Sequence, residues 1–173
     1  MSATRRALEE QFDRILAEHG AAISRLASSY EAVAGIREEL VQEIALAIWQ
    51  ALPHFRGDCS ERTFVFRIAH NRALSHASRR KPVHQPLDEL GEGNEPADPG
   101  PGPGEHLAQM VQRSQLMSAI QALSLPHRQI VVLMLEGLSH AEMAEVLGIS
   151  ENNVAVRLNR ARSALKQTLG RRP

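Results

Sequence analysis

Three polar residues near the C-terminus have the types and spacing needed to bind a polyanion. Asn153, Arg157 and Arg160 recur at intervals of four and three residues, so on a helix they share one face. Their amide and guanidinium groups match phosphate oxygens and the acceptors on base edges in the major groove of DNA. Residues 157–172 contain six Lys or Arg and no Asp or Glu, which gives this end a positive field. The pattern indicates nucleic-acid recognition.

The surrounding sequence predicts a helix-turn-helix that would position these residues. Ser139 and Glu142 form a capping box at the start of a first helix, and Ser150 can cap a second. Gly148 supplies the turn between them. The second helix has an apolar face at helical spacing, made of Val154, Leu158, Ala161 and Leu165. An ordinary helical hairpin with a solvated basic face is the alternative interpretation.

Composition narrows the class of protein. Of 173 residues, 43% are hydrophobic, and alternating β-branched runs are hard to find, so we predict an all-α globular fold. The single cysteine excludes an internal disulfide, and the eight histidines form no HExxH pattern, so no metal and no cofactor is expected. No apolar run is long enough to span a membrane and no signal peptide is recognisable, which predicts a cytoplasmic protein.

Charge and composition divide the chain into three parts. Residues 1–81 carry a net charge of +2, residues 82–112 carry −6, and residues 113–173 carry +4. The middle part is rich in proline, glycine and carboxylates, a composition that cannot bury enough surface to fold. We therefore predict two helical domains, 1–81 and 107–173, joined by a flexible acidic linker over 82–106.

Periodicity predicts the helices of both domains. In the first, Gly20 is expected to separate a helix over 4–19 from a second starting near Ala22, followed by helices over 36–52 and 63–80. In the second, four helices are expected from about Gln109 to Leu169. The apolar positions predicted to face a core in the first of these four are Met110, Leu116, Ile120 and Leu123.

Three stretches resemble one family. They are EELVQEIALAIWQALPHFRG from Glu38, FVFRIAHNRALSHASRR from Phe64, and LPHRQIVVLMLEGLSHAEMAEVLGISENNVAVRLNRARSAL from Leu125. In order and content they resemble the extracytoplasmic-function group of bacterial sigma factors, in the sigma-70 family. The resemblance implies promoter-specific transcription initiation. Its implied partners are the core RNA polymerase with its β′ clamp and β flap, promoter DNA and an anti-sigma factor.

The resemblance also implies roles for particular residues. Those implied to bind the polymerase clamp are Glu39, Leu40, Val41, Gln42 and Glu43. Those implied to open and read the minus-ten element are Phe55, Arg56, Phe64, Asn71, Arg72, Ser75, His76, Arg79 and Arg80. Those implied to read the minus-thirty-five element or hold its phosphates are Ser150, Asn152, Asn153, Arg157, Arg160, Arg162 and Lys166.

Two other classes of protein compete with this interpretation. A stand-alone transcriptional regulator would use the same kind of helix-turn-helix but would bind duplex DNA tightly without polymerase. An enzyme would need Asp13, Glu18 or His70 as an acid or base, and no phosphate loop, nucleophile elbow or paired-carboxylate motif accompanies them. The sequence therefore predicts a protein with no catalytic residues.

Overall fold

The computed structural model describes residues 3–79 and 103–170, and every regular element in these ranges is helical. The elements in chain order are α1 (Ala3–Tyr30), α2 (Ala34–Ala51), the short 3₁₀ helix η1 (Leu52–His54), α3 (Glu61–Arg79), α4 (Pro103–Gln121), α5 (Leu125–Leu135), α6 (His140–Leu147) and α7 (Glu151–Gly170). The predicted all-α fold is confirmed. We call α1–α3 the N-terminal module and α4–α7 the C-terminal module.

The first helix is longer than the sequence predicted. It continues through Gly20, where the prediction ended it, because the apolar positions Ile15, Ile23 and Leu26 keep one buried face across the glycine. A glycine inside a helix costs only about 1 kcal/mol, which the packing of that face exceeds.

Two further helices complete the N-terminal module around the same core. From α2, Leu40, Ile44 and Ile48 are fully buried, and α3 contributes Phe66 and other apolar side chains. Pro53 lies in η1 and helps to end α2, since proline cannot continue the backbone hydrogen bonds of a helix. The loop 55–60 then leads into α3, whose outer face stays polar.

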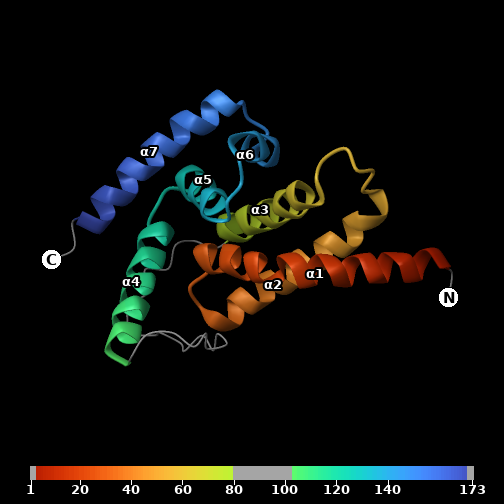
Figure 1. The fold of residues 1–173 in the computed structure, drawn as a ribbon, viewed down its shortest axis with the longest axis horizontal. Coiled ribbons are helices and arrows are strands. Elements are labelled where there is room, and N and C mark those ends of the chain that lie inside the picture. Colours follow the sequence, from red (N-terminus) through yellow and green to blue (C-terminus); the bar gives the residue numbers. More distant parts are fainter. Residues whose placement is uncertain (1–2, 80–102, 171–173) are drawn as a thin grey trace.

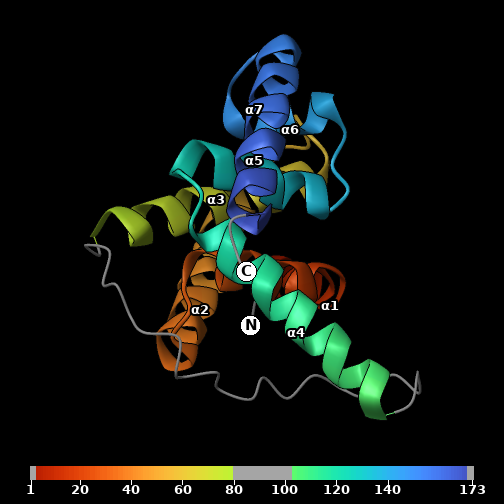
Figure 2. The same ribbon diagram turned by 90° about the vertical axis from the view of Figure 1, so that its left-hand side faces the viewer.

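The C-terminal module has the four helices that were predicted. Four consecutive residues of α5, Ile130–Leu133, are buried, which places this helix at the centre of the module. The prediction was wrong for Met110, which is exposed because the first half of α4 extends away from the other helices (Figure 2). It was also wrong for Leu116, which is exposed in the second half of the same helix. The predicted linker was also too long at its end, since residues 103–106 are already helical; its residues 82–102 lie outside the described ranges.

The two modules pack against each other. In Figure 1, α3 lies between the other helices of its own module and the pair α5 and α6. Contacts also join α1 to α4 and α5. The sequence predicted two modules on a flexible tether, and it left their relative placement open.

Polar contacts hold this junction, which we call the inter-module seam. The Arg25 guanidinium donates two hydrogen bonds to the Glu136 carboxylate, at 2.8 and 2.7 Å. Arg62 donates to the backbone carbonyl of Glu136, and Arg67 donates to that of Glu145 at 3.3 Å. Three arginines of the N-terminal module thus face acidic residues at the ends of α5 and α6.

Candidate nucleic-acid interface

The helix-turn-helix has the caps and turn that the sequence predicted. Glu142 N–H donates to Ser139 Oγ at 3.2 Å, and Ser139 N–H donates to a Glu142 carboxylate oxygen at 2.7 Å. Gly148 has a φ of +65°, a left-handed conformation that glycine adopts without strain, and it ends α6. Ser150 Oγ accepts from Asn153 N–H at 3.3 Å, so this hydroxyl caps α7.

The polar face of α7 is available for a ligand. Val154, Leu158 and Ala161 are buried against α5 and α6, which turns Asn153 and Arg160 outward. Asn152 and Lys166 are also exposed, and Arg157 is half-buried. Arg162 is exposed as well, but its Nη2 lies 3.5 Å from Met134 Sδ, so its guanidinium turns toward α5.

Removing the cap hydroxyl should loosen this unit. We expect Ser139→Ala to lower the free energy of unfolding by about 1 kcal/mol, because the Glu142 N–H loses the hydroxyl oxygen that caps it. The Ser139 backbone N–H, and after it the Ser139 hydroxyl, lower the pKa of Glu142, so their stabilisation is present above the ordinary pKa of a glutamate and is lost as the pH falls through the lowered value. The substitution removes only the share of the hydroxyl.

Urea denaturation of both proteins, at neutral pH and again near pH 3, measures this difference. The difference in the free energy of unfolding between the unchanged protein and Ser139→Ala should become smaller in acid. A difference in stability that is independent of pH would contradict an interaction between the Ser139 hydroxyl and the Glu142 carboxylate.

A second polar surface runs along α3. Asn71, Arg72, Ser75 and Arg79 are exposed there. The prediction was wrong for His76, which is buried because its Nε2 lies 3.1 Å from the Glu31 carboxylate on the inner side of the helix. Arg80 lies outside the described residues.

Two aromatic rings connect the loop 55–60 to α3. The ring of Phe55 lies 4.5 Å from that of Phe64, measured between centroids, and both side chains are half-buried. Arg56 beside them is exposed. The pair places a partly accessible aromatic surface next to the polar face of α3, which is suitable for stacking an unpaired base.

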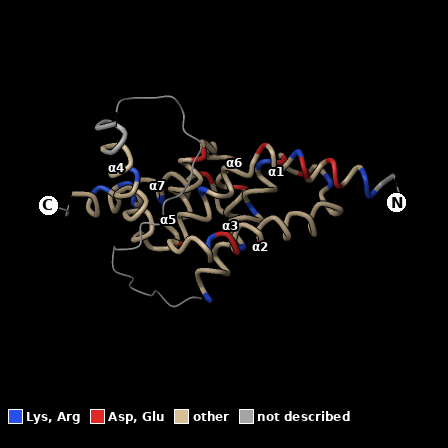
Figure 3. Tube along the Cα trace, turned by 90° about the horizontal axis from the view of Figure 1, so that it is seen from below, with Lys and Arg blue, Asp and Glu red and all other residues tan. Residues whose placement is uncertain are grey.

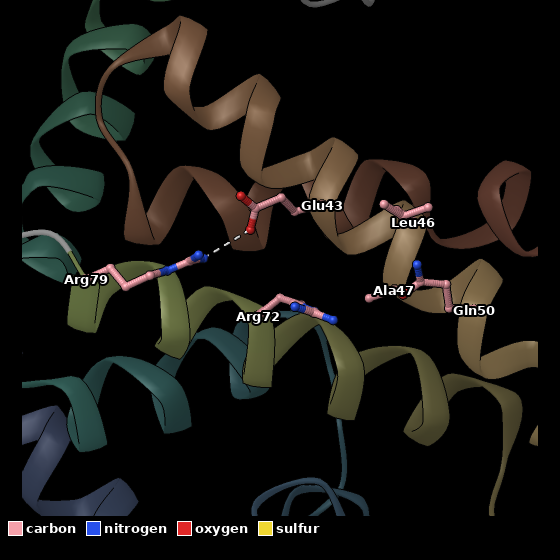
Figure 4. A pocket seen from close by; sticks show the side chains of 6 residues that line it. All are labelled: Glu43, Leu46, Ala47, Gln50, Arg72 and Arg79. Atoms are coloured by element: carbon pink, nitrogen blue, oxygen red, sulfur yellow. Dashed lines mark hydrogen bonds and ion pairs between the residues drawn. The ribbon is translucent and has the colours of Figure 1, made fainter.

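A shallow hollow of about 290 Å³ separates the exposed faces of α2 and α3 (Figure 4). The Arg79 guanidinium donates to the Glu43 carboxylate across it at 3.2 Å, and Arg72 lines the same side. On α2, Glu39 and Gln42 are exposed and Val41 is half-buried. The prediction was wrong for Leu40, which is fully buried since it belongs to the apolar stripe of α2.

Two of the residues named for the enzyme alternative, His70 and Asp13, differ in burial. His70 is buried, and its Nδ1 lies 3.2 Å from the Tyr30 hydroxyl. Burial lowers the pKa of His70 to about 4, so the ring is neutral at physiological pH. Asp13 is exposed on α1, where Figure 3 shows acidic and basic positions alternating.

The inter-module seam is the feature that the sequence did not predict. Its central partners, Arg25 and Glu136, are 111 positions apart, and each is an ordinary charged residue on its own helix. No periodicity or capping signal connects such residues. Only the path of the folded chain brings them together.

Comparison with protein families gives two matches, one in each module. Residues 15–83 match the family described as Sigma-70 region 2, and residues 113–165 match Sigma-70, region 4. The first match contains α2 and α3 with their polar faces. The second contains the whole helix-turn-helix.

Individual proteins are similar along most of the chain. The RNA polymerase sigma factor CnrH of Cupriavidus metallidurans is 30% identical over 168 residues, which cover 93% of this chain and 87% of CnrH. The ECF RNA polymerase sigma factor SigL of Mycobacterium tuberculosis is 30% identical over 155 residues, which cover 88% of this chain and 85% of SigL.

Solved structures share the arrangement of helices. The structure of CnrH in complex with the cytosolic domain of CnrY has a TM-score of 0.68 at 25% identity, covering 94% of this chain and 89% of that one. The sigma factor RpoE from Bartonella quintana, in complex with the anti-sigma factor NepR, has a TM-score of 0.69 at 21% identity, covering 95% and 99%. Within the described ranges, no helix is both long and apolar enough to cross a bilayer.

Proposed function

We propose specific roles for the residues of this chain from the premise that it belongs to the extracytoplasmic-function group of the sigma-70 family and is an RNA polymerase sigma factor. In this role it binds core polymerase and directs it to promoters. A stand-alone regulator is not favoured, because the N-terminal module matches region 2 of the family. The observation that carries the proposal is the presence of two separate polar faces, on α3 and α7, in one chain.

The C-terminal module is proposed to read the minus-thirty-five element. Its recognition helix is α7, with Asn153, Arg157 and Arg160 toward base edges and phosphates. Asn152 and Lys166 lie nearby on exposed positions and are assigned to phosphates. The contact with Met134 directs Arg162 elsewhere, so we leave it out of this set. Ser150 is assigned to the cap of α7.

The N-terminal module is proposed to open and read the minus-ten element. Its polar set on α3 is Asn71, Arg72, Ser75 and Arg79, and the adjacent aromatic surface is made by Phe55 and Phe64 beside Arg56. Recognition of an unpaired strand relies on stacking and on polar contacts to splayed bases, and this surface offers both. Catalysis would belong to the polymerase, and we assign this chain no catalytic residue.

Core polymerase is proposed to bind the exposed face of α2. We expect Gln42→Ala to weaken binding of the core enzyme by about tenfold, because an interface side chain is lost without disturbing the buried stripe of this helix. Fluorescence anisotropy of the labelled full-length chain with purified core measures the affinity.

The matched control is Gln50→Ala, the same change at an exposed position two turns further along α2. It is expected to leave core affinity near that of the unchanged protein. Equal affinities for the two variants would contradict the placement of the interface at Gln42.

The function itself is tested by transcription in vitro with bacterial core polymerase. DNA from upstream of the protein's own operon serves as template, with and without the full chain. Initiation at a defined start only in its presence is expected. Failure of both initiation and core binding would favour the stand-alone regulator. Because related sigma factors are solved with anti-sigma factors, we also propose such a partner here, and a cytoplasmic location.

A further inference from the structure

A cluster where α1 meets the start of α3 combines an imidazole with two carboxylates. Glu18 and His19 belong to α1, and Glu61 lies in the first turn of α3. One ligand-type atom from each residue lies within 4.8 Å of the other two. The cluster is separate from the polar faces of α3 and α7 assigned above.

His19 is the unusual member of this cluster. Its side chain is only 9% exposed, and within the described chain no hydrogen bond reaches either ring nitrogen. Nε2 lies 3.9 Å from a Glu18 carboxylate oxygen. Both ring nitrogens keep some contact with solvent, since in the described ranges the fully sealed polar atoms without a partner are His70 Nε2 and Arg128 Nε. The ring nitrogen that points at the carboxylates is therefore available as a ligand.

The separations suit a single metal ion. Bonds from zinc to imidazole nitrogen or carboxylate oxygen are about 2.0 to 2.2 Å, so two donors on one tetrahedral ion lie roughly 3.4 Å apart. The 3.9 Å between Glu18 and His19 needs little adjustment. Glu18 is 63% exposed and can change rotamer freely, which allows the cluster to close around an ion.

A competing cation already contacts one of the carboxylates. The Arg14 guanidinium donates to Glu61 at 3.2 Å, and the Arg14 side chain is 63% exposed. An exposed pair of this kind contributes little free energy, so a doubly charged ion with three ligands can displace it. Removing Arg14 should consequently favour metal binding.

We propose that Glu18, His19 and Glu61 form a site for a divalent transition-metal ion of the Zn²⁺, Co²⁺ or Ni²⁺ type. Imidazole nitrogen favours these ions, whereas Ca²⁺ and Mg²⁺ prefer a shell of oxygen ligands. Three protein ligands leave at least one position for water. The ligands lie on two helices and 43 positions separate the two glutamates, so no sequence motif indicates the site.

Binding would tie the middle of α1 to the start of α3. Ser60, directly before Glu61, accepts a hydrogen bond from Thr63 N–H at 3.0 Å and so ends the loop 55–60. An ion on Glu61 would restrain the end of that loop. This consequence for minus-ten reading rests on the proposed function, but the binding of metal does not.

The test uses the full-length chain alone, without polymerase or DNA. Titration with Co²⁺ is followed by visible absorption, and Zn²⁺ affinity is measured by isothermal titration calorimetry. We expect one ion per chain with the absorption of a low-coordinate Co²⁺ site. Glu61→Gln and His19→Gln should each weaken affinity by about tenfold or more, while Arg14→Gln should strengthen it.

The control is Glu10→Gln, an exposed carboxylate two turns earlier on α1, which should leave metal affinity unchanged. Circular dichroism checks that each variant is folded. If the substitution of buried His19 unfolds the chain, Glu61→Gln alone still tests the site. Absence of the Co²⁺ absorption, or an affinity that survives both ligand substitutions, would overturn the proposal and assign any binding to other histidines. Either result leaves promoter reading untouched, since it is measured without DNA.

Discussion

Glu136→Lys is expected to separate the two modules. The Glu136 carboxylate is only 9% exposed and accepts two hydrogen bonds from Arg25, and Arg62 donates to its backbone carbonyl. Losing one partner of a buried ion pair costs about 3 to 5 kcal/mol, and half-exposed Arg25 reduces that figure. The introduced lysine also repels both arginines. We expect the closed arrangement to lose about 2 to 4 kcal/mol relative to an open one.

Small-angle X-ray scattering at low salt measures the expected increase in the radius of gyration. The matched control is the exchanged pair, Arg25→Glu with Glu136→Lys, which restores opposite charges across the seam and should restore the compact form. Core affinity should stay unchanged, because Glu39 and Gln42 are exposed in the closed arrangement. An unchanged radius of gyration for Glu136→Lys would show that the apolar contacts between the modules keep them together without the ion pair.

Arg157→Ala with Arg160→Ala is expected to abolish most minus-thirty-five recognition. Both side chains belong to the polar face of α7, and within residues 3–79 and 103–170 neither forms an ion pair with an acidic residue. A base contact contributes about 1 to 3 kcal/mol of discrimination, which is roughly 5- to 150-fold in affinity. Loss of a phosphate contact instead lowers the salt dependence of binding by about one counterion.

Affinity of the reconstituted holoenzyme for a promoter and for a scrambled minus-thirty-five sequence, over a series of salt concentrations, separates these roles. Arg162→Ala is the matched control, since it removes the same charge from the same helix but from a side chain turned toward Met134. If Arg162→Ala weakens promoter binding as much as the double variant, the loss of positive charge alone would explain the effect. The assignment of Arg157 and Arg160 to specific DNA contacts would then be wrong.

Local features were predictable because their causes lie within a few residues of each other. The capping box of Ser139 and Glu142 and the turn at Gly148 depend on backbone groups three or four positions apart, and both formed as predicted. The inward face of α7 follows from the 3.6-residue period alone. Where a local signal competed with packing, as at Gly20, packing decided the outcome.

Burial of individual polar and apolar residues was less predictable. Leu40 lies in a stretch implied to bind polymerase, yet it belongs to the core, and neighbouring Gln42 does not. His76 lies on a helix with a polar outer face but turns inward to Glu31. Consecutive residues on a helix point about 100° apart. A resemblance that gives one role to a run of consecutive residues therefore cannot say which of their side chains face the partner.

The sequence by itself determined the all-helical fold, the helix-turn-helix with its basic face and the resemblance to sigma factors. These follow from periodicity, caps and composition, which act between neighbours along the chain. Only the tertiary structure placed Arg25 on Glu136, Arg79 on Glu43, and Glu61 beside His19. The physical reason is that a charged side chain has the same local pattern whether it meets solvent or a distant partner, and only the path of the folded chain selects between them.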